Sequence, residues 1–203
     1  MLAPVAVSTG AFMERELATV SVLSKFRKFE MVIFLALFCV ISVFFRLGSL
    51  LVSRRHEAAL RESGAVEIGR TNSVVLALAH VLYYVSSMIE AAFRPHDVDR
   101  SFWLGIFLYF VGMMTLVFVI HLLGRLWTVK LLIVRDHVLV THQLFRWFRH
   151  PNYFLNILPE LAGIALILNA HTTLVAGLAL YAIPLTIRIR QEEIAMRARF
   201  KDY

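Results

Sequence analysis

A short polar segment at residues 148–154, FRHPNYF, lies between two apolar runs. Pro151 favours the first turn of a helix, because its ring fixes φ and its missing N–H would have no partner there. The free N–H groups of such a turn point toward whatever lies in front of them. Arg149, His150 and Tyr153 flank that space. The segment therefore predicts a binding site for a polar ligand.

A second polar group, Arg188, Arg190, Glu192 and Glu193, ends the last apolar run. Arg188 and Glu192 are four positions apart, so they share one face of a helix. Taken alone, the pair is best interpreted as a salt bridge beside a positively charged membrane anchor. Together with residues 148–154 it becomes a candidate for half of a site.

The composition indicates that lipid surrounds much of this chain. Of 203 residues, 59% are hydrophobic and 17% are charged, with a mean hydropathy of +0.71; soluble domains are closer to half apolar. The chain has a net charge of +7, and its basic residues lie beside apolar segments. This favours anionic lipid headgroups over nucleic acid as the partner. Cys39 is the single cysteine, so no internal disulfide forms. No metal site is predicted, since His96, Asp97 and Asp99 lack a further ligand at suitable spacing.

Apolar stretches that reach the length of a membrane helix, about 20 residues, occur at residues 31–52, 73–93 and 102–123. Residues 151–187 are apolar again. They are interrupted by NAHTT at 169–173, which predicts a turn between two shorter helices. The sequence thus predicts an all-α, multi-pass membrane protein with about five transmembrane helices.

The remaining segments complete a single domain over residues 1–203. Residues 124–150 are too polar to cross lipid and predict a structured loop. Residues 188–203 carry charged and apolar residues at helical spacing, which predicts a C-terminal amphipathic helix. Three membrane helices fall within residues 1–123, and the loop, the helical pair and the tail fall within residues 124–203.

Lysine and arginine predict the orientation. With five crossings, residues 53–72, residues 124–150 and the tail share one side, which holds most of the basic residues and is expected to be cytosolic. The basic residues at 25–28 oppose this assignment. Residues 1–30 are expected to form an interfacial segment that leads into the first crossing and is retained.

A few polar residues fall inside the predicted membrane helices. Glu160 is a candidate for substrate binding, because a carboxylate in lipid is expensive, or else it bonds to a neighbouring helix. His80 and Glu90 line a substrate cavity or, alternatively, pack against another helix. Arg46 is expected to extend to the interface.

Two segments, HVLVTHQLFRWFRHPNYF and RIRQEEIAMRARFKDY, resemble the isoprenylcysteine carboxyl methyltransferase family, in particular its short bacterial and archaeal members. That family has a loop of the form LVTSGxYxxxRHPxY and a distal RxxxEE. The resemblance covers roughly Leu123 to Tyr203, and GRLWTV and RRHEAALRESGAVEIG resemble the bacterial branch. This chain departs from the pattern at Phe145, where the family usually has tyrosine, and at His142 and Gln143, where it has SG.

The resemblance implies that the protein binds S-adenosylmethionine in a cytosolic pocket. The residues it places around the cofactor are His137, Val138, Leu139, Val140, Phe145, His150, Pro151, Asn152, Tyr153 and Glu192, and the chemistry of the cofactor's carboxylate adds Arg149. The resemblance assigns Arg188 to the acceptor. Cofactor chemistry agrees: Arg149 and His150 suit a carboxylate, Glu192 suits an ammonium or ribose, and Phe145 suits an aromatic ring or a cation.

The predicted reaction is S-adenosylmethionine-dependent methyl transfer to the carboxylate, or another oxygen, of a lipophilic, prenylcysteine-like substrate that enters from the bilayer. A carboxylate is ionised at neutral pH, so Arg188 would only orient it. An enol or phenol, as in an alkylpyrone-type polyketide lipid, would need Glu193 or His150 as a base. Phospholipid N-methylation, a steroid-type membrane reductase that binds a nicotinamide cofactor and a non-catalytic scaffold are the alternatives.

Overall fold

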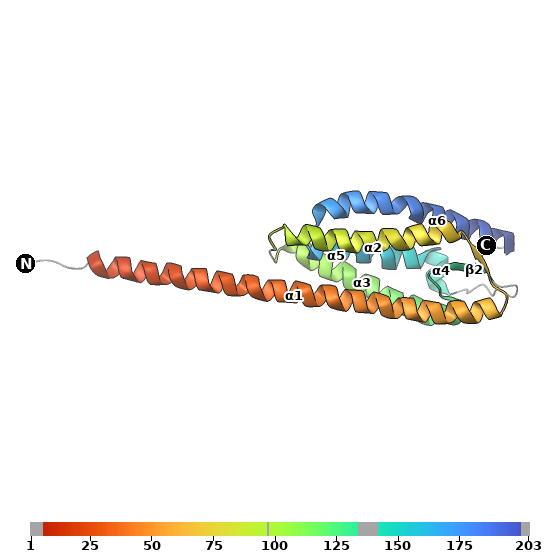
Figure 1. The fold of residues 1–203 in the computed structure, drawn as a ribbon, viewed down its shortest axis with the longest axis horizontal. Coiled ribbons are helices and arrows are strands. Elements are labelled where there is room, and N and C mark those ends of the chain that lie inside the picture. The colour runs from red at the N-terminus through yellow and green to blue at the C-terminus, as the bar shows by residue number, and fades with distance from the viewer. Residues whose placement is uncertain (1–5, 97, 134–141, 200–203) are drawn as a thin grey trace, which may run out of the picture. The chain divides into compact units, whose positions relative to one another are not determined.

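The structure is a computed structural model that describes residues 6–96, 98–133 and 142–199. Most of this part of the chain is helical (Figure 1). The longer helices are α1 (Ala6–Glu62), α2 (Arg70–Ala92), α3 (Arg100–Leu123), α5 (Leu158–Ile167) and α6 (Leu178–Arg199). The shorter elements are the 3₁₀ turn η1 (Gly124–Leu126), α4 (Gln143–Trp147), the π-helical turns η2 (Asn152–Ile157) and η3 (Thr173–Gly177), and the strands β1 (Val66–Ile68) and β2 (Leu131–Ile133).

Four helical stretches of the described chain are long and apolar enough to cross a membrane. They are Lys25–Glu62, Arg70–Ala92, Arg100–Leu126 and Thr173–Arg199. The predicted helical membrane fold is thereby confirmed. The fourth predicted crossing is the shorter stretch Asn152–Ile167, so the count of five stays a prediction. Helix α6 runs on to Arg199 without a break, and its amphipathic character also stays a prediction.

Contacts divide the chain into two compact units, residues 1–42 and residues 43–203. In the first unit the described residues belong to α1. The second unit holds the rest of α1 and every other described element, including all described residues of the predicted site. The prediction of a single domain over residues 1–203 stays a prediction.

Helices α3 and α5 pack against each other inside the second unit, and α6 packs on α2 (Figure 1). Leu116, Leu161 and other fully buried side chains form the core between them. The closest approach is at Gly163, where a Cβ atom would lie 2.5 Å from the backbone N of Tyr109 and 2.8 Å from the backbone O of Gly105. Glycine at this position therefore lets the two helix backbones touch.

Two segments expected to be loops contain more regular structure than the sequence predicts. Helix α1 continues past Val52 to Glu62, because the residues after Val52 include many strong helix formers and Glu57 pairs with Arg61 one turn later at 2.9 Å. Strand β1 then pairs antiparallel with β2, which lies in the 124–150 loop. The predicted all-α class holds for the membrane helices, but it did not include this two-stranded sheet.

The turn predicted at residues 169–173 lies between α5 and η3, where Asn169 adopts a φ of 54° and ends α5. The carboxylate of Glu90 accepts hydrogen bonds from the backbone N–H of Thr172 at 3.0 Å and of Thr173 at 2.8 Å. Glu90 therefore caps the last helical run from a neighbouring helix. The sequence left two interpretations of Glu90, lining of a substrate cavity and packing against another helix, and the structure supports the second.

Candidate active site

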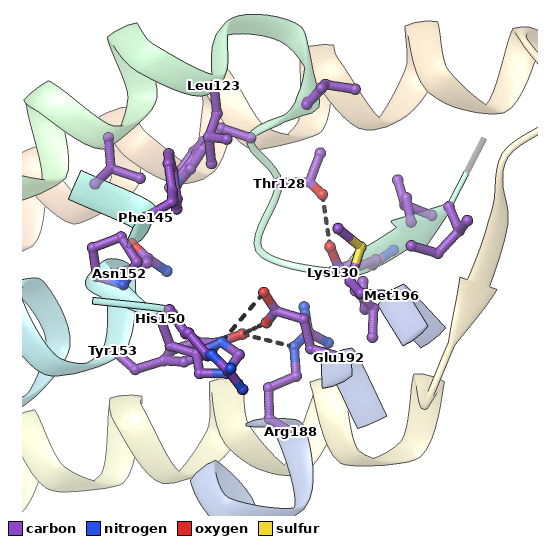
Figure 2. A pocket seen from close by; sticks show the side chains of 18 residues that line it. Leu123, Thr128, Lys130, Phe145, His150, Asn152, Tyr153, Arg188, Glu192 and Met196 are labelled. Atoms are coloured by element: carbon purple, nitrogen blue, oxygen red, sulfur yellow. Dashed lines mark hydrogen bonds and ion pairs between the residues drawn. The ribbon is translucent and has the colours of Figure 1, made fainter. Parts of the chain in front are cut away.

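The two polar segments singled out in the sequence meet around a cavity of about 180 Å³, which we name the polar cavity (Figure 2). One wall comes from α4 and the start of η2, and another comes from α6. The predicted site residues that line it are Phe145, Arg149, His150, Pro151, Asn152, Tyr153, Arg188 and Glu192. The fold thus brings together two segments that are far apart in the sequence.

Pro151 stands directly before η2, as its helix-starting role predicts. The carbonyl of His150 accepts the N–H of Tyr153 at 3.0 Å. Across the π-helical turn, Nδ2 of Asn156 donates to Oδ1 of Asn152 at 3.0 Å. Such turns are rare and occur often at functional sites. This one places Asn152 and Tyr153 in the cavity wall.

His150 is 5% exposed and faces two carboxylates of α6. Its Nδ1 lies 3.6 Å from Oε1 of Glu192, and its Nε2 lies 3.5 Å from Oε1 of Glu193. Burial lowers the pKa of His150, but the Glu192 and Glu193 carboxylates outweigh it and hold that pKa above its usual 6.5. Glu193, predicted to be catalytic, does not line the polar cavity and, among the described residues, contacts the site through His150.

Arg149 is exposed and lines the polar cavity. Within the described chain, no hydrogen bond or ion pair engages its guanidinium, so the group is available for an anion. His137, Val138, Leu139 and Val140 were predicted to lie along the cofactor, and they are outside the described residues.

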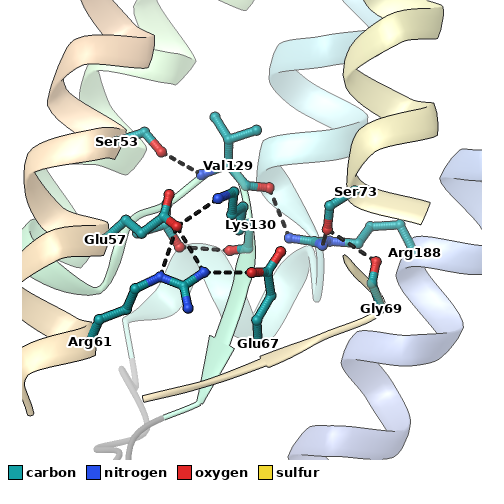
Figure 3. Close-up of polar contacts among 10 residues, drawn as sticks. Ser53, Glu57, Arg61, Glu67, Gly69, Ser73, Val129, Lys130 and Arg188 are labelled. Atoms are coloured by element: carbon teal, nitrogen blue, oxygen red, sulfur yellow. Dashed lines mark hydrogen bonds and ion pairs between the residues drawn. The ribbon is translucent and has the colours of Figure 1, made fainter. Parts of the chain in front are cut away.

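Arg188 is 3% exposed and is held by three hydrogen bonds (Figures 2 and 3). Its Nε donates to the hydroxyl of Tyr153 at 3.2 Å, its Nη1 to Oγ of Ser73 at 2.8 Å, and its Nη2 to the carbonyl of Val129 at 2.9 Å. The Tyr153 hydroxyl in turn donates to Oε2 of Glu192 at 2.7 Å. The predicted alternative of an Arg188–Glu192 salt bridge does not describe this geometry, because the two side chains meet at Tyr153.

A polar network fixes the backbone that supplies the Val129 carbonyl (Figure 3). The N–H of Val129 donates to Oγ of Ser53 on α1 at 2.8 Å. The next residue, Lys130, pairs with Glu57 on α1 at 2.6 Å. Helix α1 therefore positions one of the three groups that orient Arg188.

A second cavity, of about 490 Å³, lies beside the first, and we name it the apolar cavity. Aliphatic side chains of α1 and α2 supply much of its wall. The residues that line both cavities are Trp127, Thr128, Asn152, Tyr153 and Arg188. Tyr153 and Arg188 therefore border a polar space and an apolar space at once.

Glu160, predicted to bind substrate, is fully buried and does not line either cavity. It forms an ion pair with Arg46 and accepts the hydroxyl of Tyr84, and its Oε1 lies 3.6 Å from Nε2 of His80. Arg46, His80 and Tyr84 all line the apolar cavity. The expectation that Arg46 extends to the interface is wrong, because Glu160 holds it inside.

Sequence reasoning missed Ser73, Trp127, Thr128 and Val129. Serine and threonine are common in membrane helices and loops, so Ser73 and Thr128 did not stand out. Val129 contributes its backbone carbonyl, which every residue type has, so the sequence cannot indicate it. Trp127, Thr128 and Val129 all lie within GRLWTV, and the only signal in that segment is its resemblance to the bacterial branch of the family.

The geometry is that of an integral membrane protein with a polar site next to an apolar cavity. Residues 103–198 match the isoprenylcysteine carboxyl methyltransferase (ICMT) family. An uncharacterized protein of Haemophilus influenzae is 40% identical over 162 residues, which are 80% of this chain and 93% of the relative. The uncharacterized protein YpbQ of Bacillus subtilis is 29% identical over 153 residues, 75% of this chain and 90% of the relative. No solved structure matches the chain.

The chain belongs to the isoprenylcysteine carboxyl methyltransferase family, as its RHPNY and RIRQEE segments indicate. It is an integral membrane methyltransferase.

Proposed function

We propose that this methyltransferase moves a methyl group from S-adenosylmethionine to the carboxylate, or another oxygen, of a lipophilic acceptor similar to a prenylated cysteine. The observation that carries the proposal is the wall shared by the two cavities, where Tyr153 and Arg188 border both. A water-soluble cofactor in the polar cavity and a lipid in the apolar cavity would meet at that wall.

The residues of the polar cavity fit the cofactor. Arg149 offers a charged donor for its carboxylate, Glu192 an acceptor for its ammonium or ribose, and Phe145 an aromatic face. Trp127 is 4% exposed, and its indole N–H has no hydrogen-bond acceptor among the described residues. A ligand acceptor in the polar cavity would satisfy this buried donor. S-adenosylmethionine supplies a methyl group on a positively charged sulfur, which becomes a neutral thioether as the methyl passes to the acceptor oxygen.

Arg188 orients the acceptor. A guanidinium has five N–H donors, and three of those on Arg188 are used by Tyr153, Ser73 and Val129. The other two can bind a carboxylate, and the three fixed bonds leave the group little freedom to move. Because that carboxylate is ionised at neutral pH, the chain needs no general base and contributes orientation and exclusion of water.

The other acceptor classes fit the same residues less well. A phenol or enol, as in an alkylpyrone lipid, would need Glu193 or His150 to take a proton, and these two groups contact each other. A phospholipid amine would gain nothing from the cation of Arg188. The active site faces the cytosol in this proposal, since S-adenosylmethionine is made there and the basic loops indicate that side.

The test uses the purified protein in lipid nanodiscs. Calorimetry should detect binding of S-adenosylhomocysteine and no binding of NADPH. Arg149→Gln should weaken the binding of S-adenosylhomocysteine. The control Arg125→Gln changes an exposed arginine outside both cavities and should leave that binding unchanged. A farnesylated cysteine should then accept a labelled methyl group. Binding of NADPH instead of S-adenosylhomocysteine would refute the proposal.

A further inference from the structure

Hydrogen-bonding residues lie in or directly behind the wall of the apolar cavity at two levels. Ser53 and Glu160 do not line the cavity but bond to residues that do. The outer cluster consists of Arg188, Tyr153 and Ser73, together with Ser53, which they reach through the Val129 backbone. The inner cluster consists of Glu160, Arg46, Tyr84, His80 and Tyr181: Glu160 bonds to Arg46 and Tyr84, and Nδ1 of His80 lies 3.4 Å from the hydroxyl of Tyr181. An acceptor with a plain hydrocarbon tail would need a polar cluster only at the end that is methylated. The second cluster therefore needs another explanation.

The two clusters are separated by two helical turns. Four helical stretches each give one residue to each cluster, seven positions apart: Arg46 and Ser53, Ser73 and His80, Tyr153 and Glu160, Tyr181 and Arg188. In the three pairs that lie on α1, α2 and α6, seven positions at a rise of 1.5 Å per residue separate the levels by about 10 Å and keep both residues on nearly the same face. The fourth pair, Tyr153 and Glu160, runs from the π-helical turn η2 into α5. The clusters are therefore two layers of one cavity.

Two residues that line the apolar cavity near the inner cluster, His80 and Asn156, each carry a buried polar atom without a hydrogen-bond partner in the described chain. The buried Nη2 of Arg46 is engaged by its ion pair with Glu160. One of the two unpaired atoms is Nε2 of His80, which lies 3.6 Å from Oε1 of Glu160, just beyond hydrogen-bond distance. The other is Oδ1 of Asn156, which is 1% exposed and stands on η2 between Tyr153 and Glu160. Both side chains line the apolar cavity. Buried polar atoms are nearly always paired, so these two indicate a polar group that comes from a ligand.

We propose that the acceptor is a lipid with two polar groups: the oxygen that is methylated beside Arg188, and a hydroxyl that binds His80 in the inner cluster. The inference rests on the proposed function, in which the apolar cavity holds the acceptor. A hydroxyl both donates and accepts, so it satisfies Nε2 of His80 in either tautomer. A plain hydrocarbon tail would leave Nε2 and Asn156 Oδ1 buried without partners.

Direct binding to the protein in nanodiscs tests this with simple probes. Fatty acids and ω-hydroxy fatty acids of the same chain length form matched pairs, in which the carboxylate binds at Arg188 and only the second polar group differs. At the chain length that reaches the inner cluster, the hydroxyl should tighten binding by about tenfold or somewhat less, the effect of one net hydrogen bond. His80→Phe should abolish that gain, taken as the ratio of the two affinities of a matched pair within the variant. Met88→Leu, a change to an apolar lining residue, should keep it.

The possible outcomes separate this inference from the proposed function. If both members of every pair bind equally to the unsubstituted protein, the second polar group is refuted while an acceptor site in the apolar cavity remains, and this comparison requires no variant. A gain that persists in His80→Phe also overturns the inference. If no fatty acid binds at any chain length, the assignment of the apolar cavity to the acceptor fails, and with it the proposed function.

Discussion

Arg188 and Glu192 lie one turn apart on α6 but bond to a third residue rather than to each other. The hydroxyl of Tyr153 accepts from Nε of Arg188 at 3.2 Å and donates to Oε2 of Glu192 at 2.7 Å. Only Arg188 lines the apolar cavity, whereas both line the polar one. A simple salt bridge would give the two residues one shared role, and this geometry gives them separable ones.

Arg188→Lys should impair the acceptor more than the cofactor. Lysine keeps the charge but cannot form the planar set of bonds to Tyr153, Ser73 and Val129. Loss of one charged hydrogen bond, about 1.5–3 kcal/mol, should lower kcat/KM for the acceptor by about 10- to 150-fold. Cofactor Kd, measured by calorimetry, should change by less than about threefold.

Glu192→Gln should have the opposite profile, with the cofactor Kd raised most and the acceptor KM changed least. The reason is that Glu192 lines only the polar cavity. Equal and mild effects of Arg188→Lys and Glu192→Gln on every parameter would show that the pair serves only as a membrane anchor.

Tyr153→Phe should affect both partners at once, because its hydroxyl joins Arg188 to Glu192. Removing it takes one hydrogen bond from each of the two charged side chains, so we expect cofactor Kd and acceptor KM each to rise by at least about 10-fold, as for the loss of one hydrogen bond to a charged group. Tyr83→Phe is the matched control, since Tyr83 is buried but lines neither cavity. An effect on only one of the two constants would contradict a bridging role.

The sequence predicted the parts of this site that local motifs encode. RHPNY and RIRQEE carry charged and aromatic groups at short spacing, and apolar runs predicted the membrane helices, because both signals lie within one segment. The rest depends on contacts between segments. Arg46 meets Glu160, Ser73 meets Arg188, and β1 meets β2 only after the helices pack, and no local pattern specifies such partners.

The stability of the protein should depend on pH through His150. Its pKa is raised in the folded state, so the favourable contacts with Glu192 and Glu193 are fully present below about 6.5, the unfolded value, and are lost as the pH rises through the folded pKa. His150→Gln removes this dependence. The melting temperature of the native protein should therefore exceed that of the variant more at pH about 6 than at pH about 8.5. A constant difference across this range would show that His150 is not protonated in the fold.

The contact between α3 and α5 should not tolerate a methyl group at Gly163. The added Cβ would lie 2.5 Å from the backbone N of Tyr109, and neither backbone can move without separating the helices. Gly163→Ala should therefore destabilise the protein by at least about 1–3 kcal/mol, as overpacking does. Gly48→Ala is the control, because nothing lies within 4 Å of its added Cβ, and alanine there should be neutral or stabilising by up to about 1 kcal/mol. Similar melting temperatures for the two variants would argue against the close helix contact.

The orientation of the protein can be tested with two single cysteines in a Cys39→Ala background. Arg199 is exposed at the end of α6, beyond the residues of the polar cavity. His171 is exposed in the turn before η3, near the opposite end of the same helical run. If the active site faces the cytosol, an impermeant thiol reagent added to intact cells should label His171→Cys and should label Arg199→Cys only after the cells are opened. The reverse pattern would place the polar cavity outside, where S-adenosylmethionine is not made, and labelling of both would show that the two positions are not on opposite sides of the membrane.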